Sequence, residues 1–214
     1  MQVQGFTFNP FAENTYVLHD ESGECAIVDP GCYDRQEQDK LVNFIETKSL
    51  KPVLLLNTHC HLDHIFANAY ISEKYDLPIH GHREEVPVLN ASPKMANLYG
   101  LQLTPSPEIK HFLDQGDNVS FGNTTLEVRF TPGHSPGSIC FLDKTGKKVI
   151  SGDVLFMDSI GRTDLPGGDH QTLLNSIEKQ LLPLDDEWEV YSGHGPKTTI
   201  GRERRYNPFL KAMV

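Results

Sequence analysis

A cluster of metal-binding residue types follows directly after a strand-like apolar run, and this junction limits the possible folds more than any other part of the sequence. The run Val53-Leu-Leu-Leu56 is bounded by Pro52 and Asn57. A continuous apolar run of this length is typical of a strand buried on both faces. It leads directly into Thr58-His-Cys-His-Leu-Asp-His64. The sequence therefore predicts a core strand that ends in a histidine-rich loop.

The spacing within this loop predicts converging ligands. Side chains alternate at the end of a strand, so His59 and His61 project to one side and Cys60 points to the interior. Where the chain turns after His61, Asp63 and His64 can converge on a second metal position nearby. Nitrogen and carboxylate ligands suit zinc or a similar divalent ion. Three histidines and one aspartate at these offsets arise by chance in about one such chain per thousand.

Three further ligand types sit singly between small turn residues after predicted strands. His134 lies within Thr131-Pro-Gly-His-Ser-Pro-Gly137, Asp153 ends Ser151-Gly-Asp, and His194 lies within Tyr191-Ser-Gly-His-Gly-Pro196. Small turn residues let the backbone approach closely. We therefore expect these three side chains to join the same metal centre.

The order of elements predicts the architecture. The chain has 214 residues, which favours a single domain over 1–214. Both halves begin with strands and continue with helices, and both place ligand types where strands end. The predicted fold is α/β (α+β), a four-layer αββα sandwich with the metal site at the edge between two sheets. Its expected segments include one strand over 6–19, a helix over 34–48, a possible lid over 84–110, strands at 118–121 and 124–130, and a helix over 171–181.

Composition and charge exclude several classes of protein. No apolar run approaches the roughly 18 residues that a membrane span requires, and the first residues lack the pattern of a signal peptide. Four cysteines without a C-x-x-C pair suit a reducing compartment, so we expect a cytoplasmic protein without membrane contact. The net charge of -10 disfavours a nucleic-acid partner.

With these motifs in place, the sequence resembles the metallo-β-lactamase superfamily, and within it the glyoxalase II-like thioester hydrolases. The resemblance runs from Asn14-Thr-Tyr16 through Ile27-Val-Asp-Pro-Gly31 and the T-H-x-H-x-D-H motif to His194-Gly-Pro196. It implies two divalent metal ions, zinc first, with iron or manganese as alternatives. The implied ligands are His59, His61 and His134 for the first ion, Asp63, His64 and His194 for the second, and Asp153 as the bridge.

The resemblance also implies an activity. A metal-bridging hydroxide would attack an acyl carbon, with Asp63 and Asp153 as the catalytic carboxylates. A thiolate departs without a positioned acid, which favours a thioester such as an S-(2-hydroxyacyl)glutathione. Arg162, in Gly161-Arg-Thr-Asp-Leu-Pro-Gly-Gly168, aligns with a basic residue that grips the glutathione moiety, so we expect it to bind an anionic small-molecule substrate. Asp29 would orient a metal-binding imidazole; the alternative is a plain turn aspartate before Pro30.

The sequence departs from typical glyoxalase II at three places. Asp164 stands where an aromatic residue is usual, and Gly195-Pro196 stands where the longer enzymes carry a tyrosine. The chain ends 20 residues after His194, which is too short for their helical C-terminal domain. The basic run Arg202-Glu-Arg-Arg205 either attracts an anionic substrate or forms a solvated surface.

The sequence leaves open one alternative to the hydrolase activity and one alternative position for a metal site. Persulfide dioxygenases of the same fold use one iron, and His59, His134 and Asp153 could supply the required two histidines and one carboxylate. Three other classes are set aside. A diiron flavoprotein has glutamate at the position of His61, and a processing nuclease is disfavoured by the negative net charge of this chain. A non-catalytic binding protein would be expected to have lost metal ligands, and none of the seven is missing. His80-Gly-His82 repeats the H-x-H spacing but lacks following ligands.

Overall fold

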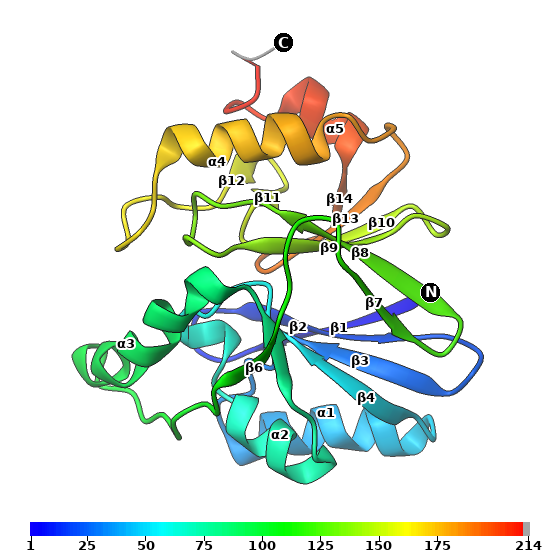
Figure 1. Ribbon diagram of the computed structural model, residues 1–214, viewed down its shortest axis with the longest axis vertical. Coiled ribbons are helices and arrows are strands. Elements are labelled where there is room, and N and C mark those ends of the chain that lie inside the picture. Colours follow the sequence, from blue (N-terminus) through cyan, green and yellow to red (C-terminus); the bar gives the residue numbers. More distant parts are fainter. Residues whose placement is uncertain (212–214) are drawn as a thin grey trace. The chain divides into compact units, whose positions relative to one another are not determined.

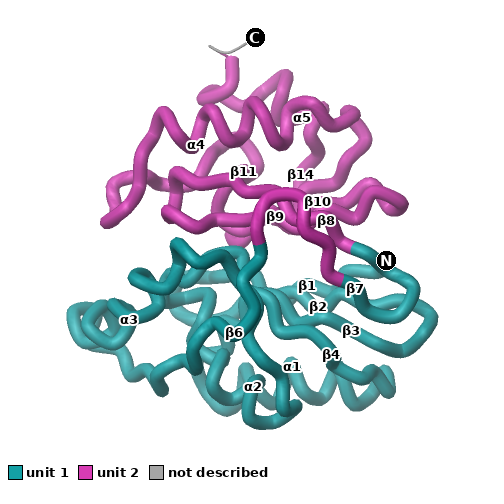
Figure 2. Tube along the Cα trace, in the orientation of Figure 1, with its two compact units in different colours: residues 1–113, 120–125 teal, residues 114–119, 126–214 magenta. Residues whose placement is uncertain are grey.

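The computed structural model describes residues 1–211, in two compact units. Unit 1 comprises residues 1–113 and 120–125, and unit 2 comprises residues 114–119 and those from 126 onward (Figure 2). The family-like motifs fall in both units. The single domain over 1–214 stays a prediction.

Unit 1 is built on a six-stranded sheet with the strand order β1-β2-β3-β4-β5-β6. Its strands are β1 (Gln2–Phe8), β2 (Glu13–His19), β3 (Glu24–Val28), β4 (Lys51–Leu56), β5 (Ile79–Gly81) and β6 (Ile109–Phe112). β1, β2 and β3 pair antiparallel, and β3, β4, β5 and β6 pair parallel. Its helices are α1 (Arg35–Thr47), η1 (Leu62–His64), α2 (Asn68–Tyr75), η2 (Arg83–Glu85) and α3 (Val86–Leu98).

Helices α1 and α2 cover one face of this sheet (Figure 1). The Asp34 side chain caps α1 by accepting the Glu37 N–H at 3.0 Å. Leu41 and Ile45 of α1 pack with Ile27 and Leu55 of the sheet in one buried cluster. This confirms the helix predicted over 34–48 and the core strand that leads to the histidine loop.

Unit 2 carries the second sheet, with the order β14-β13-β10-β9-β8-β7. Its strands are β7 (Asn118–Phe121), β8 (Thr124–Phe130), β9 (Ile139–Asp143), β10 (Lys148–Gly152), β13 (Glu189–Ser192) and β14 (Thr198–Thr199), and β11 (Leu155–Phe156) pairs with β12 (Ser159–Ile160). The tip of the β7–β8 hairpin is grouped with unit 1. β10 and β13 are parallel, whereas β9 and β14 run antiparallel to their neighbours.

The helical segments of unit 2 cover one face of its sheet (Figure 1). They are α4 (His170–Ser176), the π-helix η3 (Ile177–Leu181) and α5 (Ile200–Tyr206). Leu173 and Ile177 pack in one buried cluster with Leu142 and Val190 of the sheet. The predicted helix over 171–181 is thus α4 continued by η3, and the predicted strands at 118–121 and 124–130 are β7 and β8.

One sequence prediction is wrong in detail, and one segment contains a helix that the sequence analysis did not predict. The segment 6–19 is not one strand, because Asn9 and Ala12 adopt positive φ values of 52° and 57° and turn the chain between β1 and β2. The segment 84–110 contains α3 despite two prolines. Pro87 lies in the first turn, where its missing N–H costs nothing. Pro93 lies inside the helix, and there the Ser92 hydroxyl donates to the Leu89 carbonyl at 2.7 Å in place of the lost N–H.

Candidate metal centre

In unit 1 the histidine loop brings three imidazoles together after β4. The ring centroid of His59 lies 4.9 Å from that of His61 and 4.1 Å from that of His64. His59 and His64 are buried, and η1 forms the turn that carries Asp63 and His64. Cys60 points away into the apolar core, as the alternation predicted, and burial raises its thiol pKa well above the ordinary value.

Asp29 reaches this loop because β3 and β4 are parallel and end at the same edge. Val28 pairs with Leu56, so Asp29 lies beside Thr58. The Asp29 carboxylate accepts the Thr58 N–H at 2.8 Å and the Thr58 hydroxyl at 2.6 Å. Its Oδ2 also lies 3.1 Å from His64 Nδ1. Asp29 is therefore part of the histidine loop rather than a plain turn residue.

These hydrogen bonds fix the tautomers of two imidazoles. A carboxylate only accepts, so His64 Nδ1 donates to Asp29 and its Nε2 carries no proton in the neutral ring. The Thr58 hydroxyl donates its one proton to Asp29. Its oxygen therefore accepts a hydrogen bond from His59 Nδ1, which lies 3.1 Å away. In both rings Nε2 is therefore the nitrogen that could coordinate a metal. Asp29, His59 and His64 also place one ligand atom each within 4.8 Å of one another.

Two buried carboxylates that support this loop were missed by the sequence analysis. Glu85 accepts the backbone N–H of Cys60, between His59 and His61, at 2.7 Å. Glu13 is fully buried, with Oε1 3.8 Å from His64 Nδ1, and burial raises its pKa well above the ordinary value. Glu13 directly precedes the Asn14-Thr-Tyr16 motif, which was an available signal. Glu85 carried no such signal.

In unit 2 the other ligand types meet by the same strand geometry. β10 and β13 are parallel, Gly152 pairs with Ser192, and the N–H of Gly193 donates to the Gly152 carbonyl at 2.8 Å. Asp153 and His194 therefore follow their strands at one edge of the sheet. His194 Nε2 lies 3.5 Å from Asp153 Oδ2, and His134 Nε2 lies at the same distance from the same oxygen.

These distances fit shared metal ligands. Two donor atoms bound at about 2.0 to 2.1 Å to one tetrahedral ion lie about 3.4 Å apart. One carboxylate oxygen at 3.5 Å from two imidazole nitrogens matches that spacing on both sides. His134 Nδ1 donates to the Arg162 carbonyl at 2.7 Å, so Nε2 is the nitrogen of this ring that could coordinate a metal. The donor set of imidazoles and carboxylates, without thiolates, fits zinc, iron or manganese.

Glycines hold the unit 2 ligands through close backbone contact. A Cβ on Gly161 would lie 1.9 Å from the Asp153 carbonyl oxygen. Gly133, which precedes His134, has a φ of +130°, and a Cβ there would lie 2.2 Å from the Leu173 nitrogen. No other residue fits either position without moving the backbone.

The predicted substrate contact, Arg162, is exposed and paired. Its guanidinium donates from Nε and Nη2 to both carboxylate oxygens of Asp164. The other basic candidates are also paired: Arg202 with Asp158 and Glu203, and both Arg204 and Arg205 with Asp186. The run 202–205 therefore forms ion pairs of α5 rather than an open cationic surface.

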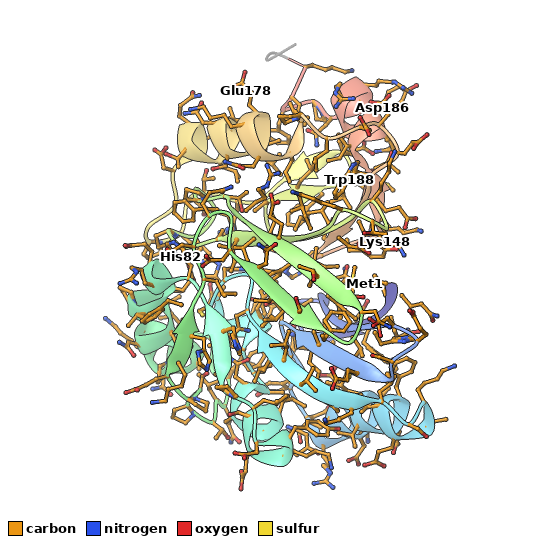
Figure 3. The ribbon with its side chains drawn as sticks, turned by 45° about the vertical axis from the view of Figure 1, so that its right-hand side comes forward. Met1, His82, Lys148, Glu178, Asp186 and Trp188 are labelled. Atoms are coloured by element: carbon orange, nitrogen blue, oxygen red, sulfur yellow. The ribbon has the colours of Figure 1, made fainter. Side chains whose placement is uncertain are left out.

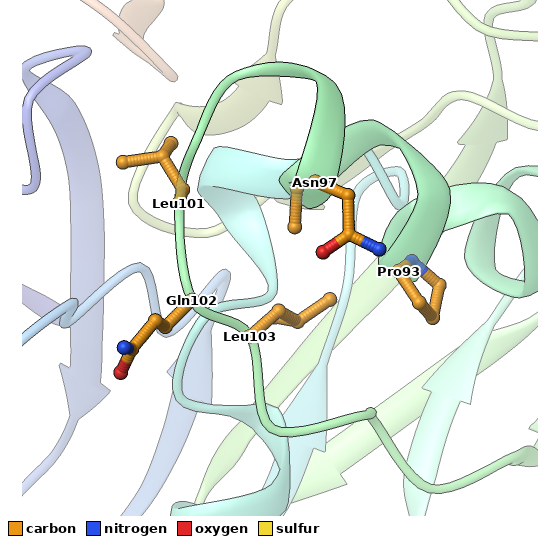
Figure 4. Close-up of a pocket in the computed structure, with 6 residues that line it drawn as sticks. Pro93, Asn97, Leu101, Gln102 and Leu103 are labelled. Carbon is orange, nitrogen blue, oxygen red and sulfur yellow. The ribbon is translucent and has the colours of Figure 1, made fainter.

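Two further predicted features have ordinary structural roles. His80 stacks on His111 with ring centroids 4.5 Å apart, and His82, labelled in Figure 3, caps η2 by accepting the Glu84 N–H at 3.2 Å. Neither belongs to a ligand group among residues 1–211. Within the segment 84–110, the possible lid, a cavity of about 350 Å³ lies beside α3 (Figure 4). Its lining is Pro93, Ala96, Asn97, Leu101, Gln102 and Leu103.

Comparison with known sequences gives one family. The family model of the metallo-beta-lactamase superfamily matches residues 8–194. A probable metallo-hydrolase of Bacillus subtilis, YqgX, is 42% identical over 218 residues, which cover 100% of this chain and 99% of that protein. The hydroxyacylglutathione hydrolase GloC of Haemophilus influenzae is 37% identical over 219 residues, which cover 99% of each.

Solved structures agree with the sequence comparison. The BLEG-1 B3 metallo-beta-lactamase gives a TM-score of 0.90 at 38% identity and covers 98% of this chain and 100% of its own. TTHA1623 in a di-iron-bound form gives 0.88 at 39% identity, covering 97% and 100%. ETHE1 from Myxococcus xanthus gives 0.79 at 26% identity, covering 97% and 84%. The predicted fold, with two sheets flanked by helices, is thereby confirmed. Within residues 1–211, no helix has the length and apolar character of a membrane span.

Proposed function

The chain belongs to the metallo-β-lactamase superfamily, and we propose that it is a metal-dependent hydrolase of the glyoxalase II type that cleaves a thioester. The observation that carries this proposal is that hydrogen bonds hold three imidazoles in the tautomer that metal binding requires. His59, His64 and His134 each have Nδ1 on a protein acceptor, which leaves Nε2 as the ligand atom. The likeness to GloC supports the thioester as the substrate class.

The proposed ligand set is the one expected from the sequence. His59, His61 and His134 would hold one ion, Asp63, His64 and His194 would hold a second, and Asp153 would be the carboxylate shared by both. We propose zinc for both positions, with manganese or iron as alternatives, and the di-iron form of TTHA1623 supports iron. Two such ions, when bound, activate a water molecule and polarise a carbonyl, which is the chemistry of hydrolysis near neutral pH.

The protein's own residues supply orientation and charge. Asp29 and Thr58 hold His59 and His64 in the tautomers that the site needs. The Arg162 carbonyl does the same for His134, while its side chain is the proposed contact for an anionic substrate. No general acid is required of the chain, because a thiol with a pKa of about 8.5 leaves as the thiolate.

A thioester panel on metal-quantified protein tests this proposal. We expect hydrolysis of lactoylglutathione with two ions per chain, and an Arg162→Ala variant that raises KM several-fold with little change in kcat. Arg205→Ala, which removes a surface arginine of the same unit, is the matched control. Metal-loaded protein that cleaves no thioester would contradict the proposed function.

An iron dioxygenase remains the second candidate, and the likeness to ETHE1 gives it some weight. It needs only His59, His134 and Asp153 as ligands to one iron. The presence of Asp63, His64 and His194 favours the two-metal hydrolase. One iron per chain together with oxygen uptake on glutathione persulfide would decide for the dioxygenase.

The remaining sequence predictions are part of the same proposal. We propose a single domain, a small-molecule anionic thioester as the partner, no nucleic-acid or membrane partner, and a cytoplasmic location. Sedimentation of the purified protein with RNA and with vesicles tests the two excluded partners, and cell fractionation tests the location.

A further inference from the structure

The loop Gly161–Gly168 carries an ion pair that directly concerns substrate choice. Arg162 Nε lies 2.8 Å from Asp164 Oδ1, and Nη2 lies 2.7 Å from Oδ2. This two-point geometry is the one by which a guanidinium recognises a carboxylate. The hydrogen bonds from Arg162 lower the pKa of Asp164 to about 2, so the aspartate is ionised at neutral pH. The Asp164 carboxylate thus binds the Arg162 guanidinium, the group expected from the sequence to bind the substrate.

The backbone that carries Arg162 is held in place beside the unit 2 candidate ligands. The Arg162 carbonyl accepts from His134 Nδ1, so the backbone of Arg162 is part of the ligand support. The preceding residue, Gly161, contacts the Asp153 carbonyl so closely that no Cβ fits. The loop therefore cannot shift at residues 161 and 162 without disturbing His134 and Asp153. The Arg162 side chain therefore extends from a backbone position that is held beside His134 and Asp153.

The pair is exposed enough for exchange with a substrate. The side chains of Arg162 and Asp164 are 60% and 67% exposed. An ion pair in such surroundings is weak, so a carboxylate from solution can replace Asp164 at a cost of about two- to fivefold in affinity. While Asp164 stays paired, its carboxylate also neutralises the positive charge of Arg162. The cost of displacing Asp164 and this neutralisation both reduce the affinity that a substrate gains from a negative charge.

We propose that Asp164 is a specificity-determining residue that competes with the substrate carboxylate for Arg162. This inference rests on the proposed thioester hydrolysis. It predicts that the wild-type preference for thioesters with a carboxylate on the thiol portion is about two- to fivefold smaller than it would be without Asp164. It also accounts for the sequence departure at this position, since an aromatic residue would leave the arginine to the substrate.

A merely structural role for the pair makes a different prediction. If Asp164 only stiffened the loop, its removal would disturb His134 through Arg162 and lower kcat for every substrate alike. Competition for the guanidinium instead changes KM, and only for substrates that carry a carboxylate. The comparison of a charged and an uncharged thioester with the same acyl group therefore separates the two roles.

The experiment measures kcat and KM for lactoylglutathione and for the lactoyl thioester of N-acetylcysteamine, which has no charge. Asp164→Asn should lower KM for lactoylglutathione about two- to fivefold, with unchanged kcat and unchanged KM for the uncharged thioester. The double variant Arg162→Gln with Asp164→Asn should lose that gain. Asp158→Asn, which opens the similar exposed pair of Asp158 and Arg202 in the same unit, should change neither KM.

Two results would overturn the inference: an equal change of KM for both thioesters, or a fall in kcat without a selective change of KM. Absence of hydrolysis by the wild-type protein would overturn the proposed function instead. The inference is then decided by calorimetric binding of glutathione itself. Asp164→Asn should bind glutathione about two- to fivefold more tightly than the wild type, and equal affinities would refute the competition.

Discussion

In unit 1, Asp29 and the histidine loop follow the parallel strands β3 and β4, whereas in unit 2 Asp153 and His194 follow the parallel strands β10 and β13. The carboxyl ends of parallel strands share an edge, so both units gather polar side chains by the same geometry. What differs is the support behind the ligands. In unit 1 the Asp29 side chain supports His64 and the Glu85 side chain supports the Cys60 N–H, whereas in unit 2 a backbone carbonyl, that of Arg162, supports His134. Close glycine contacts occur in both units, at Gly31 and at Gly161.

This difference shows two ways to fix an imidazole. A side-chain carboxylate can orient a ring while the backbone keeps some freedom, and its removal is a local change. A backbone carbonyl orients a ring only if the main chain itself is held in place. We therefore expect the unit 1 support to be sensitive to the loss of a charge, and the unit 2 support to a displacement of the main chain at Arg162.

The largest effect is expected at Asp153, because its Oδ2 contacts both His134 and His194. Asp153→Ala should lower kcat/KM on the order of 10³-fold and remove bound metal, since the ions supply several kcal/mol of charge stabilisation. Elemental analysis and thioester kinetics measure both effects, with Asp158→Asn as the control. Unchanged turnover in Asp153→Ala would contradict the shared-ligand role.

The second largest effect is expected at Asp29 in unit 1. Asp29→Ala removes the acceptor for His64 Nδ1 and for the Thr58 hydroxyl, so both tautomers lose their support. Metal affinity should fall about 10- to 100-fold, while the ligands themselves remain. Competition with a metal chelator measures this. If Asp29→Ala bound metal as tightly as the wild type, orientation by the carboxylate would be unimportant here.

The contrast between the units also explains how much the sequence predicts. The histidine loop and its strand are local, so Thr58 to His64 indicates both the strand end and the ligands within seven residues. In unit 2 the candidate ligands are separated by up to 60 positions, from His134 to His194, and only the turn residues beside them gave a signal. Their proximity depends on the parallel pairing of β10 and β13, which a single sequence does not display.

The supporting residues were harder to predict for a physical reason. Glu85 precedes a helix that contains two prolines, and its contact with Cys60 spans 25 positions. The helix itself was missed because Pro93 argues against one, and the compensating Ser92 hydroxyl is visible only in the structure. The pairing of Arg162 with Asp164 lies within the loop, yet the side-chain geometry is not encoded in the spacing.

A smaller effect is expected from added volume at Gly161. Gly161→Ala places a Cβ against the Asp153 carbonyl, and overpacking of this kind costs about 1 to 3 kcal/mol. Gly81→Ala in β5 of unit 1 is the control, because a Cβ there meets its nearest atom at an ordinary 3.4 Å. Urea unfolding should show a lower free energy of unfolding for Gly161→Ala only. Equal losses in both variants would mean that the close contact of Gly161 with the Asp153 carbonyl does not hold the main chain in place.

The smallest effect concerns Asp20, a unit 1 carboxylate that is 7% exposed and belongs to no ligand group. Burial opposes its ionisation, but hydrogen bonds from Ser22, Thr124 and Asn123 outweigh burial and lower its pKa to about 2. The ordinary value is about 3.9, so ionised Asp20 stabilises the fold above that pH, and the stabilisation is lost as the pH falls towards 2.

Asp20→Asn should lower the free energy of unfolding by about 1 to 2 kcal/mol at pH 7, because charge-assisted hydrogen bonds are lost. Urea unfolding from pH 7 down to pH 2 should show the wild type and the variant converging below about pH 4. The metal content should not change, in contrast to Asp29→Ala. Both aspartates are held by hydroxyl and backbone donors, but only Asp29 also contacts an imidazole. Loss of metal in Asp20→Asn would mean that carboxylate support in unit 1 acts through general stability rather than through His64.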